Sequence, residues 1–126
     1  MKLNTATDYG IRIILCLAKA EKPLSSSKLA GILGISPRYL LQIGAKLQKA
    51  GLVEVALGAA GGYSLGKDFY KLTLYDVFMA MEGTVQWPCS PEKTKEAFPK
   101  LKAVYKQLNT CLIQIMESIP LQDLLS

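Results

Sequence analysis

The chain has 126 residues, half of them hydrophobic and a fifth charged, so it can form one core, as one domain or a small domain with an appended element. It contains no histidine, which excludes histidine general bases, histidine-activated nucleophiles and histidine-ligated zinc. The net charge is +5, and its excess lies in residues 1–68, which hold nine Lys or Arg against four Asp or Glu, whereas residues 69–126 hold six of each. That asymmetry indicates a polyanionic partner for the first half, although a basic surface without a ligand would have the same composition.

The first residues, Met1-Lys2-Leu3-Asn4, lack the order of regions that a signal peptide has. The longest apolar run, residues 13–18, is far shorter than the roughly 20 residues needed to cross a bilayer. We therefore expect a cytoplasmic protein with no membrane partner.

Two helices are predicted before residue 34. Apolar residues recur at helical spacing over residues 5–20, and Lys22-Pro23 ends this pattern. The serines at 25–27 offer N-caps for a helix over about 26–33, and Gly34 can end it because glycine readily adopts a positive φ. We expect the 26–33 helix to bury Leu29, Ile32 and Leu33.

A helix and a β-hairpin are predicted next. Ser36 is the expected N-cap of a helix that extends to about Ala50, and Pro37 takes its first position, where a missing N–H is harmless. Residues 52–56 and 63–65 favour two strands, and the glycine-rich segment between them forms the turn of the hairpin.

Two more helices are predicted in the second half. Thr73 caps a helix over about 74–81, with Val77, Phe78 and Met81 expected to face inward. Pro99 opens the longest helix, which extends to about 118. The loop between them has a possible short helical turn near residues 90–92.

The apolar side of the 99–118 helix has the spacing of a coiled-coil seam. A helix of this length has little core left to pack on, so we interpret it as a dimerisation helix; the alternative is a helix folded back on its own domain. The predicted dimerisation residues are Leu101, Val104, Tyr105, Leu108, Leu112, Ile115 and Ile119.

The 26–33 and 37–50 helices, joined by a short turn, form a helix-turn-helix, and the hairpin after them makes a winged helix. Arginine and glutamine near the start of a recognition helix can bond to base edges, and lysines suit phosphates. A solvated amphipathic helix without a ligand would have the same polar side. The candidate DNA-binding residues are Ser26, Ser36, Pro37, Arg38, Tyr39, Gln42, Lys46 and Lys49, together with Gly58, Gly61, Gly62 and Lys67 in and after the hairpin.

The end of the hairpin nearly matches a nucleotide-binding loop. Residues 61–68 place Asp68 where the pattern G-x-x-x-x-G-K-[ST] needs a hydroxyl ligand for magnesium, and no helix clearly follows. We interpret the glycines as a tight turn of the wing. No nucleophile motif or catalytic carboxylate pair appears either, so we expect no enzymatic activity.

Several motifs carry a resemblance that covers nearly the whole chain. They are Met1-Lys2-Leu3 with Tyr9, Leu29-Ala30, Gly34-Ile35-Ser36, Tyr39-Leu40, Leu47, Lys49-Ala50-Gly51-Leu52-Val53, Gly58-x-x-Gly61-Gly62-Tyr63-x-Leu65, Thr73-Leu74 with Val77, and Ile119-Pro120-Leu121. In these the chain resembles the Rrf-two family of winged-helix bacterial transcription regulators, the IscR-, NsrR- and CymR-like proteins.

The resemblance implies a mainly α fold with a small β-hairpin. We expect a winged helix-turn-helix DNA-binding domain in residues 1–82, a loop or sensor region in 83–98, and a dimerisation helix with a short tail in 99–126. It also implies a homodimeric regulator, acting as a repressor, on a pseudo-palindromic operator in double-stranded DNA. The 37–50 helix would enter the major groove and the wing the adjacent minor groove.

One departure from the family lies in the wing. The family usually carries arginine just before the first wing glycine, where this chain has Leu57, and Ala59-Ala60 replaces its usual proline or glycine. Because arginine is strongly attracted to a narrow minor groove, we expect DNA affinity to be lower or differently specified. The alternative function is a winged-helix protein-interaction or regulatory module with weak or no specific DNA binding.

A second departure concerns the cysteines. Cluster-binding members carry three cysteines in the loop before the last helix, whereas this chain has only Cys89 there. With no histidine to complete a ligand set, we expect no iron–sulfur cluster and no bound metal. Cys89 is a candidate redox thiol, with an ordinary loop cysteine as the alternative. We expect Cys16 to be buried in the core and Cys111 to pack on the dimer seam.

A small-molecule or redox effector is a further possible partner. Trp87 and Tyr105 are candidates to line an effector pocket, with aromatic packing as the alternative.

Overall fold

The computed structural model describes residues 4–84 and 98–125. Within these residues the elements are, in chain order, α1 (Thr5–Lys19), α2 (Ser26–Leu33), α3 (Pro37–Lys49), β1 (Val53–Ala56), β2 (Gly62–Leu65), the 3-10 helix η1 (Phe69–Lys71), α4 (Leu74–Glu82), α5 (Pro99–Glu117) and the 3-10 helix η2 (Leu121–Leu124). They confirm the predicted mainly α fold with one small hairpin. The possible helical turn at 90–92 lies outside the described residues.

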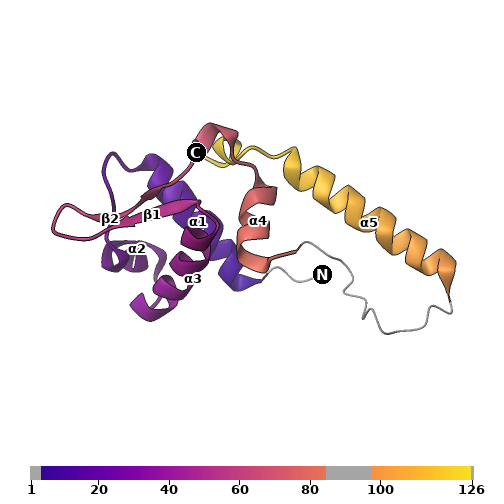
Figure 1. Cartoon of the computed structure of the whole chain (residues 1–126), viewed down its shortest axis with the longest axis horizontal. Coiled ribbons are helices and arrows are strands. Elements are labelled where there is room, and N and C mark those ends of the chain that lie inside the picture. The colour runs from indigo at the N-terminus through magenta and orange to yellow at the C-terminus, as the bar shows by residue number, and fades with distance from the viewer. Residues whose placement is uncertain (1–3, 85–97, 126) are drawn as a thin grey trace.

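Helices α1 to α4 and the hairpin pack around one core, and α5 extends away from them (Figure 1). Helix α1 is central, because it contacts α2, α3, α4 and β2. The two strands are antiparallel, with Val53 opposite Leu65 and Ala56 opposite Gly62. No helix in the described part of the chain is long and apolar enough to cross a membrane.

Short polar side chains set the starts of the helices. The Ser25 hydroxyl accepts a hydrogen bond from the Lys28 N–H at the start of α2 (3.1 Å), and the Ser36 hydroxyl accepts one from the Tyr39 N–H at the start of α3 (3.1 Å). Gly34 ends α2 with a φ of 69°. The predicted helix boundaries are confirmed to within one or two residues. They could be predicted because capping residues can be recognised from the sequence alone.

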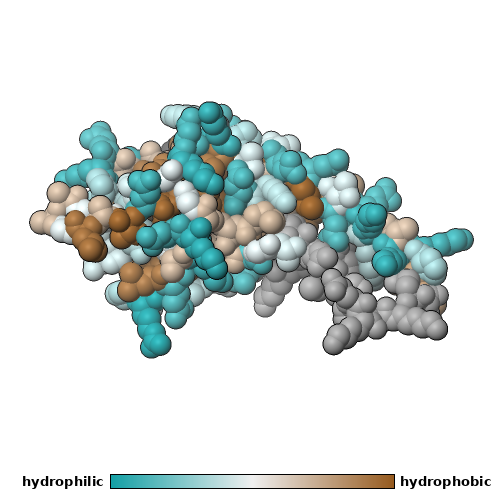
Figure 2. All heavy atoms as spheres, in the orientation of Figure 1, coloured by the Kyte–Doolittle hydropathy of each residue, from teal (hydrophilic) through white to brown (hydrophobic). Residues whose placement is uncertain are grey.

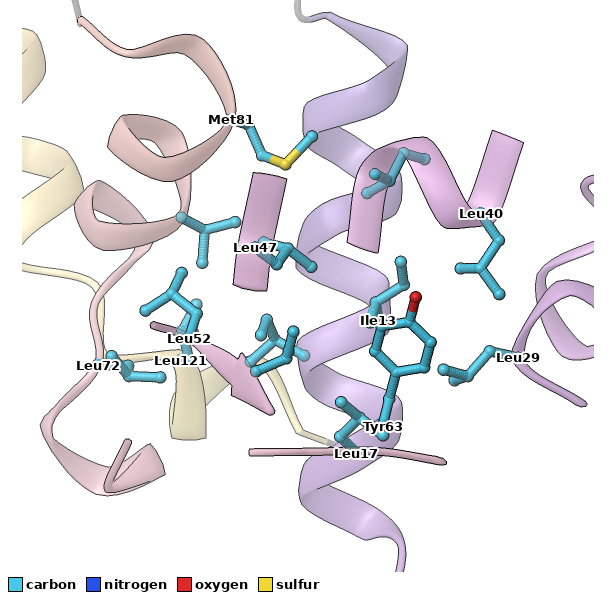
Figure 3. Packing of buried hydrophobic residues seen from close by; sticks show 14 of the residues in the cluster. Ile13, Leu17, Leu29, Leu40, Leu47, Leu52, Tyr63, Leu72, Met81 and Leu121 are labelled. Atoms are coloured by element: carbon cyan, nitrogen blue, oxygen red, sulfur yellow. The ribbon is translucent and has the colours of Figure 1, made fainter. Parts of the chain in front are cut away.

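The core is built from the apolar sides of α1 and α3, closed by the hairpin and α4 (Figure 3). The fully buried side chains include Ile13 and Ile14 of α1, and Leu40 and Leu47 of α3. Together with its other buried members, this cluster fixes α3 on the body through one side only, so the opposite side of α3 is left to solvent.

Two predicted core positions are wrong. Ile32 is 55% exposed, because α2 turns its Leu29–Ala30 side to the core and Ile32 lies beyond Leu29 on the solvent side. Phe78 of α4 is only half-buried, although its neighbour Val77 is fully buried. Apolar residues on a short helix did not reveal which side faces the core.

A short helix after the wing was not foreseen. Asp68 accepts a hydrogen bond from the Tyr70 N–H (3.1 Å) and so caps η1. The carboxylate that broke the nucleotide-loop pattern therefore has a structural partner. The chain after α5 returns to the same place, where the Leu121 N–H donates to the Leu72 carbonyl (3.0 Å) and Leu121 is fully buried.

Helix α5 buries little of its own surface. Met116 is its one buried residue within the described chain. Four of the predicted dimerisation residues are large and exposed, namely Leu101 (45%), Val104 (49%), Leu108 (40%) and Ile115 (57%). The other three, Tyr105, Leu112 and Ile119, are partly buried.

Candidate nucleic-acid interface

The solvent side of α3 is the centre of the candidate site. Helix α2, the turn at Gly34-Ile35 and α3 form the helix-turn-helix, and the Ile35 N–H donates to the Ala30 carbonyl (3.1 Å) within it. Arg38, Gln42 and Lys49 are all exposed on α3. Their spacing of four and seven residues places them on one side of the helix.

The cations of this surface are free to bind a ligand. Among the described residues, the one ion pair is Arg12 with Asp8 (3.0 Å), so neither Arg38 nor Lys49 has a carboxylate partner there. A carboxylate partner would compete with phosphate for these cations, and its absence leaves them available to a polyanion.

Lys46 and Tyr39 lie at the edge of the α3 surface rather than at its centre. The Lys46 ammonium donates to the Met81 carbonyl near the end of α4 (3.5 Å). The Tyr39 ring meets Tyr9 of α1 edge-on, with centroids 5.9 Å apart. Both side chains thus contact neighbouring helices, and a small pocket of about 180 Å³ lies between them, bordered also by Gln42.

One large apolar residue that is exposed on α3 was missed in the sequence. Leu41 is 51% exposed beside Gln42 and three positions after Arg38. Its position on the helix, three residues after Arg38, could have indicated exposure, but its apolar side chain favoured a prediction of burial. The α3 surface therefore offers an apolar contact next to its polar ones.

The remaining candidates on the helices lie around α3. Ser36 and Pro37 are exposed at its start, and Ser26 is half-buried in the first turn of α2. Lys67 is exposed after β2, and its side chain lies over Gly51, just past the end of α3. These positions surround the exposed side of α3.

The tip of the wing, residues 57–61, extends from the body at the end of the hairpin (Figure 1). The Gly61 N–H donates to the Gly58 carbonyl (3.0 Å) and closes the turn. Gly62 begins β2 and is partly buried. Leu57, just before the first of these glycines, is 95% exposed.

The wing is attached firmly to α3. Tyr63 of β2 is buried, and a Cβ placed on Gly44 of α3 would lie 2.7 Å from the Tyr63 hydroxyl oxygen, so the absence of a side chain at Gly44 is what lets the two elements meet. Tyr63 also exchanges two backbone hydrogen bonds with Leu24 (2.7 and 3.0 Å). Burial raises the pKa of the Tyr63 phenol above its usual value.

The cysteines of the described chain lie in separate places. Cys16 is half-buried rather than buried, because it lies at the border of the α1 core side, and burial raises its pKa against the opposing effects of Lys19 and Arg12. Cys111 is exposed on α5. Cys89 and Trp87 lie outside the described residues.

The described residues contain no group of three or more Cys, Asp or Glu side chains placed to hold a metal ion.

Comparison with known proteins gives a consistent result. Residues 3–126 match the model of the Rrf2 family, described as an iron-dependent transcriptional regulator. The chain is 33% identical over 129 residues to the HTH-type transcriptional regulator CymR of Bacillus subtilis, covering 100% of this chain and 91% of the relative. It is 30% identical over 133 residues to the HTH-type transcriptional regulator NsrR of Halalkalibacterium halodurans, covering 100% and 91%.

Solved structures show the same relationship. The structure of CymR, the global cysteine regulator of B. subtilis, has a TM-score of 0.82 with 31% identity and covers 98% of this chain and 95% of that one. The structure of IscR from T. potens has a TM-score of 0.79 with 29% identity, covering 98% and 85%. The predicted winged-helix fold is thereby confirmed along nearly the whole chain.

Proposed function

The chain belongs to the Rrf2 family of transcriptional regulators, and on that premise we propose that it is a homodimeric repressor that binds a pseudo-palindromic operator in double-stranded DNA. The observation that carries this proposal is the exposed side of α3, which bears Arg38, Gln42 and Lys49 with no carboxylate partner in the described chain. A basic helix beside a projecting hairpin fits a duplex, whose phosphates supply the opposite charge.

In the proposed complex α3 lies in the major groove. Arg38 and Gln42, in its first two turns, read base edges, because these side chains can form paired hydrogen bonds with guanine and adenine. Lys49 and Lys67 contact phosphates of the DNA. The N-terminus of α3, capped by the exposed Ser36, also lies near a phosphate. The wing reaches the adjacent minor groove.

A second copy of the chain covers the apolar side of α5. Leu101, Val104, Leu108 and Ile115 are 40–57% exposed in the single chain, and a two-fold interface would remove them from water. The two α3 helices would then face two half-sites of inverted sequence, which is why a pseudo-palindrome is expected.

We also propose that the protein works without an iron–sulfur cluster. The three cysteines of the chain and its lack of histidine do not make a four-ligand set, and Cys16 and Cys111 lie on different helices, one half-buried and one exposed. The residues present therefore do not fit an iron–sulfur cluster, although the family is described as one of iron-dependent transcriptional regulators. An effector or a redox reaction at Cys89 remains a proposed source of the signal.

An absorption spectrum of anaerobically purified protein, with iron and sulfide assays, tests whether the protein lacks an iron–sulfur cluster. We expect a colourless protein that binds operator DNA. Iron and sulfide near stoichiometric amounts would overturn it.

Repeated selection of duplexes from a random-sequence library by the wild-type protein tests the operator proposal. We expect enrichment of two inverted half-sites, and log K for the selected duplex should fall steeply with log salt because several phosphates are contacted. Equal affinity for every sequence at physiological salt would refute a specific operator.

A further inference from the structure

The wing of this protein carries no charge. From residue 55 to residue 66 no side chain is charged, and the flanking charged residues are Glu54 and Lys67. Leu57 is 95% exposed and is the most exposed large apolar side chain in the described chain. Figure 2 shows brown, hydrophobic atoms at the wing end of the molecule, at the left.

The wing tip cannot easily move away from a duplex that is bound on α3. Tyr63 packs against Gly44 of α3 and pairs with Leu24, so both the side chain and the backbone of β2 are tied to the helix-turn-helix. Only the tip beyond Ala56 projects freely. The base of the wing, up to Ala56, is thus held in place with respect to α3, and Leu57 follows directly after it.

The shape of the tip fits a narrow groove. Leu57 is followed by Gly58, Ala59, Ala60 and Gly61, so one large side chain stands beside very small ones. The minor groove of B-DNA is about 6 Å wide, and proteins insert apolar side chains such as leucine into it. A protein-docking surface would ordinarily join several large apolar side chains into one patch, whereas this tip has a single one.

We infer that Leu57 enters the minor groove of the operator and contacts sugars and base edges by apolar burial, without contacting phosphate through charge. This inference rests on the proposed function. It implies that the wing contributes affinity that salt does not screen, and that it favours pyrimidine–purine steps, which are flexible and easily kinked or unstacked by an inserted apolar side chain.

The test is a titration of the duplex selected by the wild-type protein, over a range of salt concentrations. Leu57→Ala should weaken binding roughly tenfold with an unchanged salt slope, because an apolar contact is lost and no phosphate contact changes. Leu57→Arg should steepen the slope by about 0.9 per protomer, because it adds a phosphate contact. Leu124→Ala removes another exposed leucine, 41% exposed in η2, and should change neither quantity.

Competition with distamycin, which occupies the minor groove, locates the contact. Distamycin should displace the wild-type protein and should affect the residual binding of Leu57→Ala much less. Since Leu57 is almost fully exposed, both Leu57 variants should unfold at the wild-type temperature.

Two failures can be told apart. If Arg38→Ala weakens binding but Leu57→Ala binds as tightly as wild type, the wing inference is wrong and the operator proposal stands. If the wild-type protein prefers no sequence, the proposed function itself fails. A Leu57→Ala variant that loses affinity with a shallower salt slope would also contradict an apolar contact.

Discussion

Helices α3 and α5 are both amphipathic, but among residues 4–84 and 98–125 only α3 buries its apolar side. Helix α3 has 13 residues and buries Leu40, Ile43, Gly44 and Leu47, whereas α5 has 19 residues and buries Met116. The difference shows which surface of each helix is available for a partner. On α3 the polar side is left over, which suits DNA, and on α5 the apolar side is left over, which suits a second copy of the chain.

The largest expected effect comes from a charge on the apolar side of α5. Leu108→Glu should shift the protein from dimer to monomer and weaken the dimer by about 3–5 kcal/mol, because a carboxylate would be buried without a partner in each protomer. Sedimentation equilibrium measures this. The control Gln114→Glu adds the same charge at an exposed position away from the seam and should leave the dimer intact. Dissociation by both variants, or by neither, would remove the distinction between the two sides of α5.

Close packing of α3 predicts the next effect. Gly44→Ala should lower the free energy of unfolding by about 1–3 kcal/mol, since the new Cβ would lie 2.7 Å from the Tyr63 hydroxyl oxygen. Gly31→Ala in α2 meets nothing within 4 Å and should be neutral or stabilising, by up to about 1 kcal/mol. Urea unfolding gives the free energy of unfolding of both variants. Equal changes would mean that α3 and the wing are not closely packed at Gly44.

A pair of substitutions distinguishes base contacts from phosphate contacts on the exposed side of α3. Arg38→Ala should weaken binding of the selected duplex by about 1–3 kcal/mol and leave scrambled DNA almost unchanged, because a base contact is lost. Lys49→Ala should weaken both duplexes alike and lower the salt slope by about 1 per protomer. Fluorescence anisotropy titrations give both quantities. A reversed pattern would exchange the roles assigned to the two cations.

The smallest effect is a pH dependence of stability at Tyr63. The pKa of the folded phenol is raised above the ordinary value of about 10, so the unfolded chain deprotonates first as the pH rises. The stability that this burial contributes is therefore complete below about pH 10 and is lost as the pH rises through the folded pKa. Tyr63→Phe should therefore lose less stability than wild type between neutral pH and pH 11. Tyr70→Phe, at a 72% exposed position, should follow the wild-type curve. Identical curves for all three proteins would show that burial of the Tyr63 phenol has no energetic consequence.

The sequence predicted the helices well because their ends depend on local chemistry. Ser25, Ser36 and Thr73 precede their helices, and Gly34 ends one with a positive φ. Such signals need only a few neighbouring residues, so they can be read without knowing the rest of the fold.

What the sequence did not predict depends on contacts between distant residues. The exposure of Ile32 follows from the way α2 packs, and the contact of Tyr63 with Gly44 joins elements nineteen positions apart. The burial of Leu121 likewise requires the chain to return past α5 to Leu72. The roles of the candidate DNA-binding residues stay predictions.

Sequence-specific binding is measured by the ratio of dissociation constants for scrambled and selected duplexes, determined with the wild-type protein at one physiological salt concentration. Specific regulators typically prefer their sites by about 10³-fold or more, and we expect a ratio of that order. A ratio near one would mean that the exposed side of α3 binds DNA by charge alone or binds another partner, and would refute a specific operator.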